Sequence, residues 1–474
     1  MVEINLHNAT NNIFLVDGGT ELTYDQLLEN EENIYNWLLP HVHFEIVIVQ
    51  IKERFQLASA ILALGRLGAS ALLINPNWSE SEVEMILNCV KAKIVLTDNR
   101  ELTYLKDLGI TVIQLSECLN TPIAAPVHGS ITLFGEVMMC TSGSTGEPKI
   151  VARTWTAIFS EVDAALKRLH YTSSDRIFSL APWTHALGLV IHFLAGIRVG
   201  ARLVSTLSIS SQASWLRIMK REAVTIVIGV PTFYSFLLQT QITDVKIRMG
   251  LSAGAALPLD IYHSFRKLFN APLFQYYGCT EAGAVTMPTL ETVNHYPSLG
   301  RPLSNICLRI VGPQGEDLKV KEVGSICISG DGLACRIWQN GGFSVMNHEY
   351  ETGDQGLLNE SGELVILGRN RDRIKVNGLG LHPGEIETVL QQHPDIAEAV
   401  VIPESNTRKG TILIAYLRPL NNIPNELELR AFCRKRLAPY KIPHKYFFVK
   451  DFERDKKGQI KRIKQREEFN GAIN

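Results

Sequence analysis

Short apolar runs rich in β-branched residues alternate with longer segments of helical periodicity over roughly the first 300 residues. The runs with strand character are Phe44–Ile51, Ser70–Pro76, Ala92–Asp98, Arg176–Leu180, Thr225–Ile228 and Pro272–Tyr276. Between the first of them, Arg54–Leu67 and Glu80–Val90 carry apolar residues at helical spacing. This repetition of strand and helix predicts parallel sheets with helices on both faces.

From about Ser304 the pattern changes to short strands separated by glycine-bearing turns, as in VGSICISG and ELVILG. These strands predict a small antiparallel or barrel-like subdomain. A last block begins at about Arg371 and ends in a Lys/Arg-rich tail. Its expected elements are helices at Pro383–Gln392 and Glu426–Leu437 and a strand pair at Ala397–Pro403 and Thr411–Pro419.

The expected fold is therefore α/β. A large N-terminal domain, residues 1–370, would contain two parallel-type α/β subdomains and a small β-barrel subdomain. A small, mobile α+β C-terminal domain, residues 371–474, would follow.

Composition limits the classes of function. The 474 residues carry a net charge of -1, so no global field favours nucleic acid, and the basic tail is more simply a solvated face. Eight cysteines without a CxxC pair fit a reducing compartment, and the N-terminus lacks the features of a secretory signal. We expect a cytoplasmic protein with no nucleic-acid partner.

One stretch, Ile177–Ile197, is almost long and apolar enough to span a membrane. Pro182, His185 and His192 interrupt it, and the two histidines would be costly in hydrocarbon. A buried strand, loop and helix is the better interpretation, and no integral membrane segment is expected.

The most distinctive local feature is the loop TSGSTGEPK, which runs from Thr141 to Lys149. Its glycines, hydroxyl groups and lysine suit a flexible loop that wraps phosphate oxygens. The spacing matches neither the GxxxxGK[ST] nor the GxGxxG pattern. Taken alone, the loop is better explained as an ordinary polar surface loop.

The loop does not stand alone. TSGSTGEPK resembles the phosphate loop of the adenylate-forming superfamily, which includes acyl-CoA synthetases, aryl-CoA ligases and adenylation domains. Further resemblances follow in the order of that family: LTYDQL, LGRLGASALLINP, PWTHALG, LSAGAAL, QYYGCTEAG, SLGRP, YETGD, GRNRDRIKVNGLGLHPGEIE and LAPYKIP. Together they span almost the whole chain.

The resemblance implies that ATP or AMP is bound and that a carboxylic acid is converted to an acyl-AMP. The implied nucleotide-binding residues are Thr141, Ser142, Gly143, Ser144, Thr145, Gly146, Lys149, Gly254, Ala255, Ala256, Tyr277, Gly278, Asp354, Arg369 and Lys375. Thr280 would donate to the α-phosphate, and Glu281 would hold Mg²⁺. Asp354 would accept the ribose hydroxyls, and Tyr277 would stack on adenine, although a turn aspartate and a core tyrosine are the simpler alternatives.

The acyl pocket implied by the resemblance is small and apolar. Its expected lining is His185, Val230, Thr232, Phe233, Ala253, Gly254, Ala255, Cys279 and Ala282. PWTHALG lacks the aspartate that amino-acid-activating relatives use, so an aryl, polyketide-like or medium-chain acid is expected. His185 would gate this pocket, with a satisfied core histidine as the alternative.

Near the C-terminus the chain departs from the family. Gln459, in GQIKR, occupies the position of the lysine that bridges the acid and the α-phosphate. A unit charge at 4 Å is worth roughly 4 kcal/mol at an effective dielectric near 20. Slow adenylation is therefore expected, unless Lys457 or Lys461 takes that place. Arg371 stands at the hinge position, where aspartate or lysine is usual.

Three hypotheses about function follow. The first is an acid–thiol ligase that passes the acyl group to coenzyme A or to the phosphopantetheine arm of an acyl carrier protein. The second is an enzyme specialised in the thioester half-reaction, and the third is a nucleotide-binding relative without chemistry. A monomer or homodimer is expected.

Overall fold

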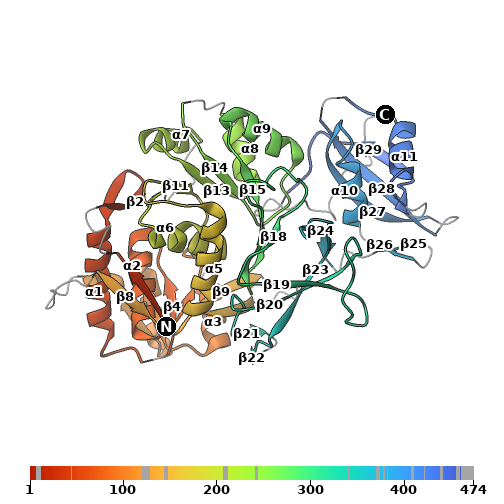
Figure 1. Cartoon of the computed structure of the whole chain (residues 1–474). Helices are drawn as coiled ribbons and strands as arrows, with labels where there is room; N and C mark the ends of the chain where they lie inside the picture. The colour runs from red at the N-terminus through yellow and green to blue at the C-terminus, as the bar shows by residue number, and fades with distance from the viewer. Residues whose placement is uncertain are drawn as a thin grey trace.

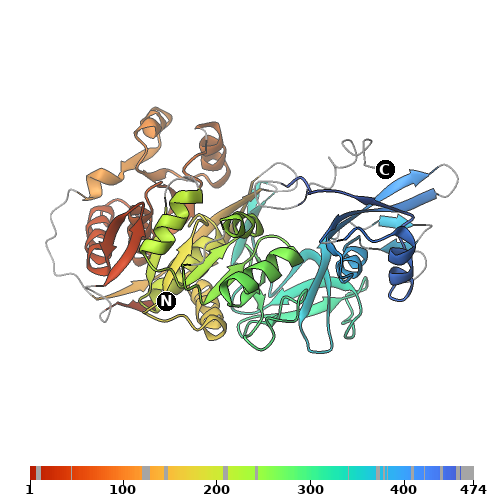
Figure 2. The ribbon, with the colours of Figure 1, turned by 90° about the horizontal axis from the view of Figure 1, so that it is seen from above.

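The computed structural model describes most of the chain: residues 1–6, 12–43, 45–78, 80–119, 129–142, 148–206, 212–240, 244–339, 341–369, 374–376, 379–381, 383–406, 410–420, 422–437, 441–454 and 460. Within them two large sheets lie at one end, a smaller antiparallel region follows, and the C-terminal block forms the other end (Figure 1). Figure 2 shows the same order along the length of the molecule from above.

The first large sheet is parallel at its centre and antiparallel at one edge. Its order is β22 (Gly342–Val345), β21 (Arg336–Gln339), β10 (Pro148–Thr154), β9 (Glu136–Ser142), β5 (Ser70–Leu73), β4 (Ile46–Gln50), β6 (Ile94–Thr97) and β7 (Thr111–Gln114). Strands β9, β5, β4, β6 and β7 run parallel, whereas β10, β21 and β22 pair antiparallel. The sequence therefore predicted the parallel centre correctly.

The second large sheet is parallel except for one edge strand. Its order is β15 (Leu273–Gln275), β14 (Met249–Ser252), β13 (Ile226–Gly229), β11 (Arg176–Ser179), β12 (Arg202–Ser205), β2 (Ile13–Asp17) and β3 (Thr20–Thr23). Only β3 is antiparallel to its neighbour. A separate two-stranded sheet of β1 (Val2–Asn5) and β8 (Ser130–Leu133) packs on the same apolar core.

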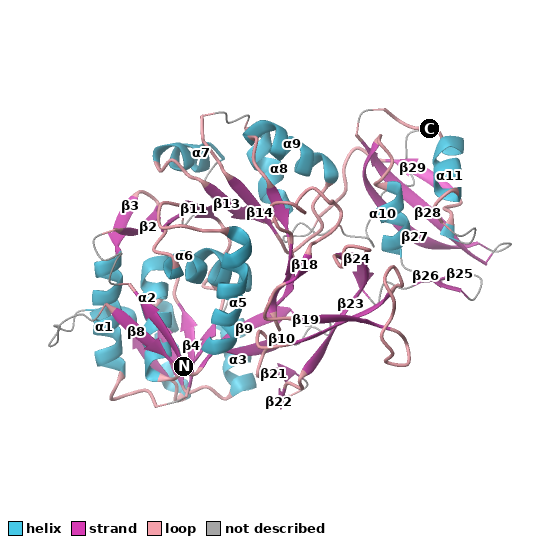
Figure 3. Cartoon of the chain, viewed as in Figure 1, coloured by secondary structure: helices cyan, strands magenta, loops and turns pink. Residues whose placement is uncertain are grey.

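Helices between the two sheets complete a shared core, as Figure 3 shows. They are α1 (Tyr24–Leu38), α2 (Arg54–Leu67), α4 (Leu115–Leu119), α5 (Trp155–Leu169) and α6 (Ala195–Arg198), with a π-helical segment at Leu187–Leu194. Thr23 and Gln26 begin α1 with reciprocal side-chain hydrogen bonds, a capping box. Gly68, at φ 75°, ends α2.

Other helices cover the outer faces of the sheets. The first sheet packs against α3 (Glu80–Val90) and a 3₁₀ helix (Arg100–Leu108). The second packs against α7 (Gln212–Arg221), α8 (Pro231–Gln239) and α9 (Leu259–Phe269). Both sheets are thus buried on two faces, as near-continuous apolar strands require.

The region from Tyr277 to Arg369 is antiparallel, and its part after Ser304 was predicted to be so. A small sheet contains β16 (Tyr277–Cys279), β17 (Gly283–Met287) and β18 (Arg301–Pro302). A four-stranded sheet contains β19 (Cys307–Val311), β20 (Gly324–Ser329), β23 (Glu349–Leu358) and β24 (Leu364–Arg369). The two share an apolar core that includes Tyr277, Ala282 and Ile326.

The C-terminal block has apolar clusters of its own. It contains β25 (Ile374–Val376), β26 (Leu379–Leu381), α10 (Pro383–Leu390), β27 (Ile396–Asn406), β28 (Gly410–Pro419), α11 (Glu426–Arg434) and β29 (Lys445–Phe448). The strand pair is confirmed. The last helix is shorter than expected and ends at Arg434, a few residues before Pro439, which cannot continue a helix.

The apolar stretch Ile177–Ile197 forms strand β11, a loop, the π-helical segment and the start of α6, as expected. Within the described residues no helix is long and apolar enough to cross a membrane.

Among the described residues, α10 and β28 of the C-terminal block both contact the rest of the chain. Gly384 of α10 lies so close to β24 that an added Cβ would stand 1.4 Å from the carbonyl oxygen of Leu367. Arg418 of β28 donates to Asp260 of α9 at 2.8 Å and to Glu398 of β27 at 2.6 Å. Arg454 also pairs with Glu398. Arg418 thus bridges the two bodies through Asp260 alone while keeping a carboxylate partner in its own block.

We predict that Asp260→Asn loosens the C-terminal block without unfolding it. Arg418 retains Glu398, so the block stays folded, but the charge that holds it to α9 is lost. Trypsin cleavage after Arg371, Arg373 or Lys375 should become about threefold to tenfold faster, the factor expected for a loss near 1 kcal/mol.

The matched control is Asp244→Asn, which removes an exposed ion pair with Lys220 within the N-terminal region. It should leave cleavage unchanged. Equal cleavage of the Asp260 variant and the parent would contradict a role for this contact in holding the block.

Candidate active site

Two strands and one hairpin turn bring together side chains that lie far apart in the sequence. Lys149 is the second residue of β10, Glu281 lies in the turn between β16 and β17, and Tyr350 lies near the start of β23. Lys149 Nζ contacts Glu281 Oε1 and donates to the Tyr350 hydroxyl at 3.0 Å. The Tyr350 hydroxyl donates to the same Glu281 oxygen at 2.8 Å.

This triangle keeps Glu281 ionised although it is 8% exposed. Burial alone would raise its pKa, but the charge and hydrogen bond of Lys149 and the hydrogen bond of Tyr350 bring the pKa below its ordinary value. The site therefore presents a buried carboxylate beside a half-buried ammonium group.

A second carboxylate, that of Asp354, lies on β23 four residues after Tyr350. Asp354 is 8% exposed, and its Oδ2 accepts from the Tyr277 hydroxyl at 2.7 Å. Its backbone N–H donates to Thr352 Oγ1 at 3.1 Å. Strand β23 thus contacts the β16–β17 hairpin at two points. Tyr350 reaches Glu281 in the turn, and Asp354 reaches Tyr277 at the start of β16.

A buried ion pair holds that hairpin on β10. Arg153, fully buried, pairs with Glu161 of α5 at 2.7 Å. Its remaining donors reach the carbonyl oxygens of Ala282 at 3.2 Å and Gly332 at 2.8 Å. Glu161 Oε1 accepts from the Ala284 N–H at 2.7 Å.

The same contacts leave no room beside the hairpin. Gly283 has φ 71°, and a Cβ added there would stand 1.8 Å from Glu161 Oε2. Glycine is required both for this backbone conformation and for the approach of the carboxylate. The carbonyl oxygen of Glu281 is fixed separately, because the Ala334 N–H donates to it at 2.7 Å.

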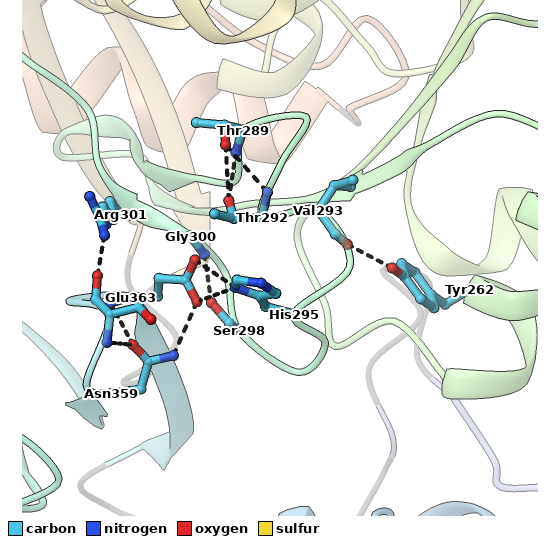
Figure 4. A network of polar contacts seen from close by, with 11 residues as sticks. Tyr262, Thr289, Thr292, Val293, His295, Ser298, Gly300, Arg301, Asn359 and Glu363 are labelled. Carbon is cyan, nitrogen blue, oxygen red and sulfur yellow. Dashed lines mark hydrogen bonds and ion pairs between the residues drawn. The ribbon is translucent and has the colours of Figure 1, made fainter.

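The far end of β23 is anchored to the loop that follows β17. Glu363, fully buried in its side chain, accepts from His295 Nδ1 at 3.1 Å and from Asn359 Nδ2 at 3.1 Å (Figure 4). Burial raises the pKa of Glu363, but hydrogen bonds from Asn359, His295 and Ser298 bring it below its ordinary value. Tyr262 of α9 holds the same loop at the Val293 carbonyl, at 2.6 Å.

The second large sheet supplies a neighbouring turn. Gly254, Ala255 and Ala256 follow β14, and Gln275 Nε2 reaches the Ala255 carbonyl at 3.4 Å. Gly254 faces Val230 after β13, since a Cβ built on Gly254 would lie 3.6 Å from Val230 Cγ1. Two residues expected in the acyl pocket are thus brought together.

Other residues of the expected pocket are buried. Phe233 is tilted against Phe178 at 6.0 Å between ring centroids and also contacts Trp215. Ala253 is buried, Thr232 and Cys279 are half-buried, and Ala282 is fully buried at the hairpin. Phe233 and Ala282 therefore also serve the apolar core.

His185 is exposed in the loop before the π-helical segment, which excludes the alternative of a core histidine. The buried histidine is His192. Its Nδ1 accepts from Trp183 Nε1 at 3.1 Å, and its Nε2 therefore carries the proton donated to the Ile177 carbonyl at 3.0 Å. Burial, together with the nearby Arg54 charge, lowers the pKa of His192 to about 3.

Several predicted site residues lie outside the description. Gly143, Ser144, Thr145, Gly146 and Gln459 are outside the described residues, as are Arg371, Lys457 and Lys461. Only the backbone is described for Thr141 and Ser142 in β9, Arg369 in β24 and Lys375 in β25. Thr280 and Gly278 lie in or beside the β16–β17 turn with Glu281.

Family models match two parts of the chain. The AMP-binding enzyme model covers residues 2–338, and the AMP-binding enzyme C-terminal domain model covers residues 385–459. The first match alone exceeds half of the chain. The chain belongs to the AMP-binding enzyme family.

Several proteins similar to this chain are named as CoA ligases or coenzyme A synthetases. The 2-succinylbenzoate–CoA ligase of Bacillus velezensis is 29% identical, over 90% of this chain and 88% of its own length. The 4-coumarate-CoA ligase 1 of Narcissus pseudonarcissus is 25% identical, over 97% and 91%. The O-succinylbenzoate coenzyme A synthetase of Bacillus subtilis in complex with AMP superposes with a TM-score of 0.77 at 25% identity and covers 98% of both chains.

For this AMP-binding enzyme, the sequence predicted Lys149, Glu281 and Asp354 as site residues but did not point to their neighbours Tyr350, Arg153 and Glu161. Tyr350 lies in the YETGD motif, where alternation along a strand gives residues 350 and 354 the same side. Arg153 interrupts an apolar strand, and Glu161 interrupts the apolar positions of a helix eight residues later. Two opposite charges in apolar segments were the available signal.

We predict that Glu161→Gln destabilises the protein by about 3 kcal/mol, because Arg153 would keep a buried charge without its counter-ion. The measurement is the free energy of unfolding in urea. Glu360→Gln, which removes an exposed ion pair with Lys321, is the control and should cause no measurable change. A Glu161 variant as stable as the parent would mean that Glu161 is protonated in the folded protein.

We further predict that His192 makes stability fall with pH below about 6.5, the ordinary histidine pKa. The unfolded chain then takes up a proton that the folded protein refuses until about pH 3. Between pH 6 and 4 this contributes up to about 1.4 kcal/mol per pH unit. Urea unfolding of His192→Gln should show a shallower pH slope than the parent, whereas His43→Gln, at an exposed site, should keep the parental slope.

Proposed function

We propose that the protein is an ATP-dependent acid–thiol ligase that forms or uses an acyl-AMP and transfers the acyl group to coenzyme A or a phosphopantetheine arm. The observation that carries this proposal is the convergence of Lys149 on β10, Glu281 in the β16–β17 turn and Asp354 on β23 of an AMP-binding enzyme. Such a site offers one cation for phosphate oxygens and two carboxylates of different surroundings.

The nucleotide would be held along β23 and the β16–β17 hairpin. Asp354 is the proposed acceptor for the ribose hydroxyls, and its bond from Tyr277 at 2.7 Å supports this role by fixing the carboxylate. Tyr277 would offer its ring to adenine beside the turn of Gly254, Ala255 and Ala256. Lys149, at the end of the glycine-rich loop, would neutralise phosphate charge.

The surroundings of Glu281 fit Mg²⁺. Mg²⁺ is commonly bound by one or two carboxylates together with substrate phosphates and water, so a cluster of protein ligands is not required. Glu281 is buried, the neighbouring Lys149 lowers its pKa, and Lys149 is the lysine proposed to bind phosphate. When bound, the cation would neutralise charge on the phosphates. Thr280, half-buried beside it, would donate to the α-phosphate.

The proposed acid is an aromatic, polyketide-like or medium-chain carboxylic acid. Val230 and Ala253 present small apolar groups near Gly254, and the exposed His185 lies in the loop that would form the pocket mouth. The relatives named for 2-succinylbenzoate and 4-coumarate favour an aromatic acid among these classes.

In this proposal Gln459 slows the adenylation half-reaction and leaves the thioester half-reaction unaffected. Where relatives use a lysine to bridge acid and α-phosphate, an amide supplies a hydrogen bond without the charge. Loss of one preorganised donor costs about 10²–10³ in rate. We therefore infer that adenylation is slow and that the thioester half-reaction is retained, with residues 371–474 acting as the mobile domain. A nucleotide-binding protein without chemistry is the second candidate, and Gln459 is the observation that favours it.

The two half-reactions can be measured separately. Synthetic acyl-AMP of an aromatic acid plus coenzyme A should give acyl-CoA faster than the same acid with ATP and coenzyme A. AMP binding with neither activity would favour the binding protein, and equal rates would contradict a specialised thioester step.

Gln459→Lys should raise acid-dependent ATP–pyrophosphate exchange at least about tenfold, because it restores a charge worth several kcal/mol at contact. The matched control is Gln465→Lys, which adds the same charge six residues away. An unchanged rate in the Gln459 variant would mean that another lysine already serves.

A further inference from the structure

Tyr350 occupies a position between the two charged groups that the proposed function separates. Its hydroxyl accepts from Lys149 Nζ at 3.0 Å and donates to Glu281 Oε1 at 2.8 Å. Lys149 Nζ also lies 5.2 Å from the centre of the Tyr350 ring. One tyrosine therefore contacts both members of the ion pair.

The ion pair cannot stay as it is when a magnesium nucleotide binds. Lys149 contacts Glu281 directly, yet the proposed function needs the lysine on phosphate oxygens and the carboxylate on Mg²⁺. Each group must exchange its present partner for the ligand. A hydroxyl that donates to the carboxylate and accepts from the lysine is compatible with both arrangements.

Packing fixes the tyrosine for this task. Its ring lies against two apolar clusters, one around Ile326 and one around Ala334 and Ile337. On one side β23 pairs with β20, where Tyr350 stands opposite Ile328. The hydroxyl is thus held by a strand that does not belong to the hairpin carrying Glu281.

We propose that Tyr350 is a positioning residue for the magnesium nucleotide. It keeps one oxygen of Glu281 hydrogen-bonded while Lys149 moves from the carboxylate to the phosphates. This inference rests on the proposed function. It assigns to Tyr350 a contribution specific to ligands that require both Mg²⁺ and phosphate, and none to AMP, which Asp354 and Tyr277 would hold.

The test is Tyr350→Phe, which keeps the ring and removes only the hydroxyl. Calorimetric binding is measured for AMP without metal and for ATP with Mg²⁺. Loss of a hydrogen bond to a charged group should weaken magnesium–ATP binding about tenfold to a hundredfold. AMP affinity should change less than about twofold, well below the effect of one hydrogen bond.

The matched control is Tyr24→Phe, which removes a buried hydroxyl bonded to the Ala201 carbonyl at 2.7 Å, away from the site. It should leave both affinities at the parental values. A Tyr350 variant that binds magnesium–ATP as tightly as the parent overturns the inference. Equal weakening of both ligands also overturns it, since a merely structural role would have that effect.

The parent protein reports on the proposed function independently. If it binds AMP and magnesium–ATP, the nucleotide site that the proposed function requires is present, and the variant alone decides the role of Tyr350. If the parent binds neither, the proposed function fails and this inference fails with it.

Discussion

The geometry of the site depends on the buried pair of Arg153 and Glu161. Arg153 lies four residues after Lys149 on one strand, and its guanidinium reaches the carbonyl oxygen of Ala282, the residue after Glu281. The strand with the cationic group and the turn with the carboxylate are therefore held by one planar, five-donor side chain. Burying a charge pair is costly, so the pair contributes specificity of arrangement more than stability.

Each carboxylate of the site also has a partner that fixes its position. Glu281 is balanced by Lys149, and Asp354 is fixed by Tyr277. The turn at the far end of β23 is tied to the loop after β17 by Glu363 and His295. Strand β23, which carries Tyr350 and Asp354, is therefore held near both ends and along its pairing with β20. These contacts fix the position of the strand before a ligand binds.

Much of the fold followed from pattern alone. Strands buried on both faces gave the parallel centres of the two large sheets, and the glycine turns after Ser304 indicated the antiparallel region. Gly283 shows where pattern fails. Its need for glycine comes from Glu161, more than a hundred residues earlier, and no local spacing reveals that contact. Tyr350 was missed for the same reason, because its two partners lie on another strand and in a hairpin turn. The residues of the loop and tail with the sharpest motifs, Ser144 and Gln459, lie outside the described part of the chain.

Under the proposed function, the first large sheet would supply groups for the phosphates and the second would supply part of the acid pocket. Lys149 belongs to the first sheet, together with the arginine that fixes the carboxylate turn. Val230 and Gly254 follow strands of the second sheet and are joined to the first through helices and core. Substitutions that reshape the second sheet's strand ends would leave the charged triangle intact. Such a scaffold is well suited to evolutionary change of its organic substrate, since new selectivity can arise without rebuilding the part that handles phosphate.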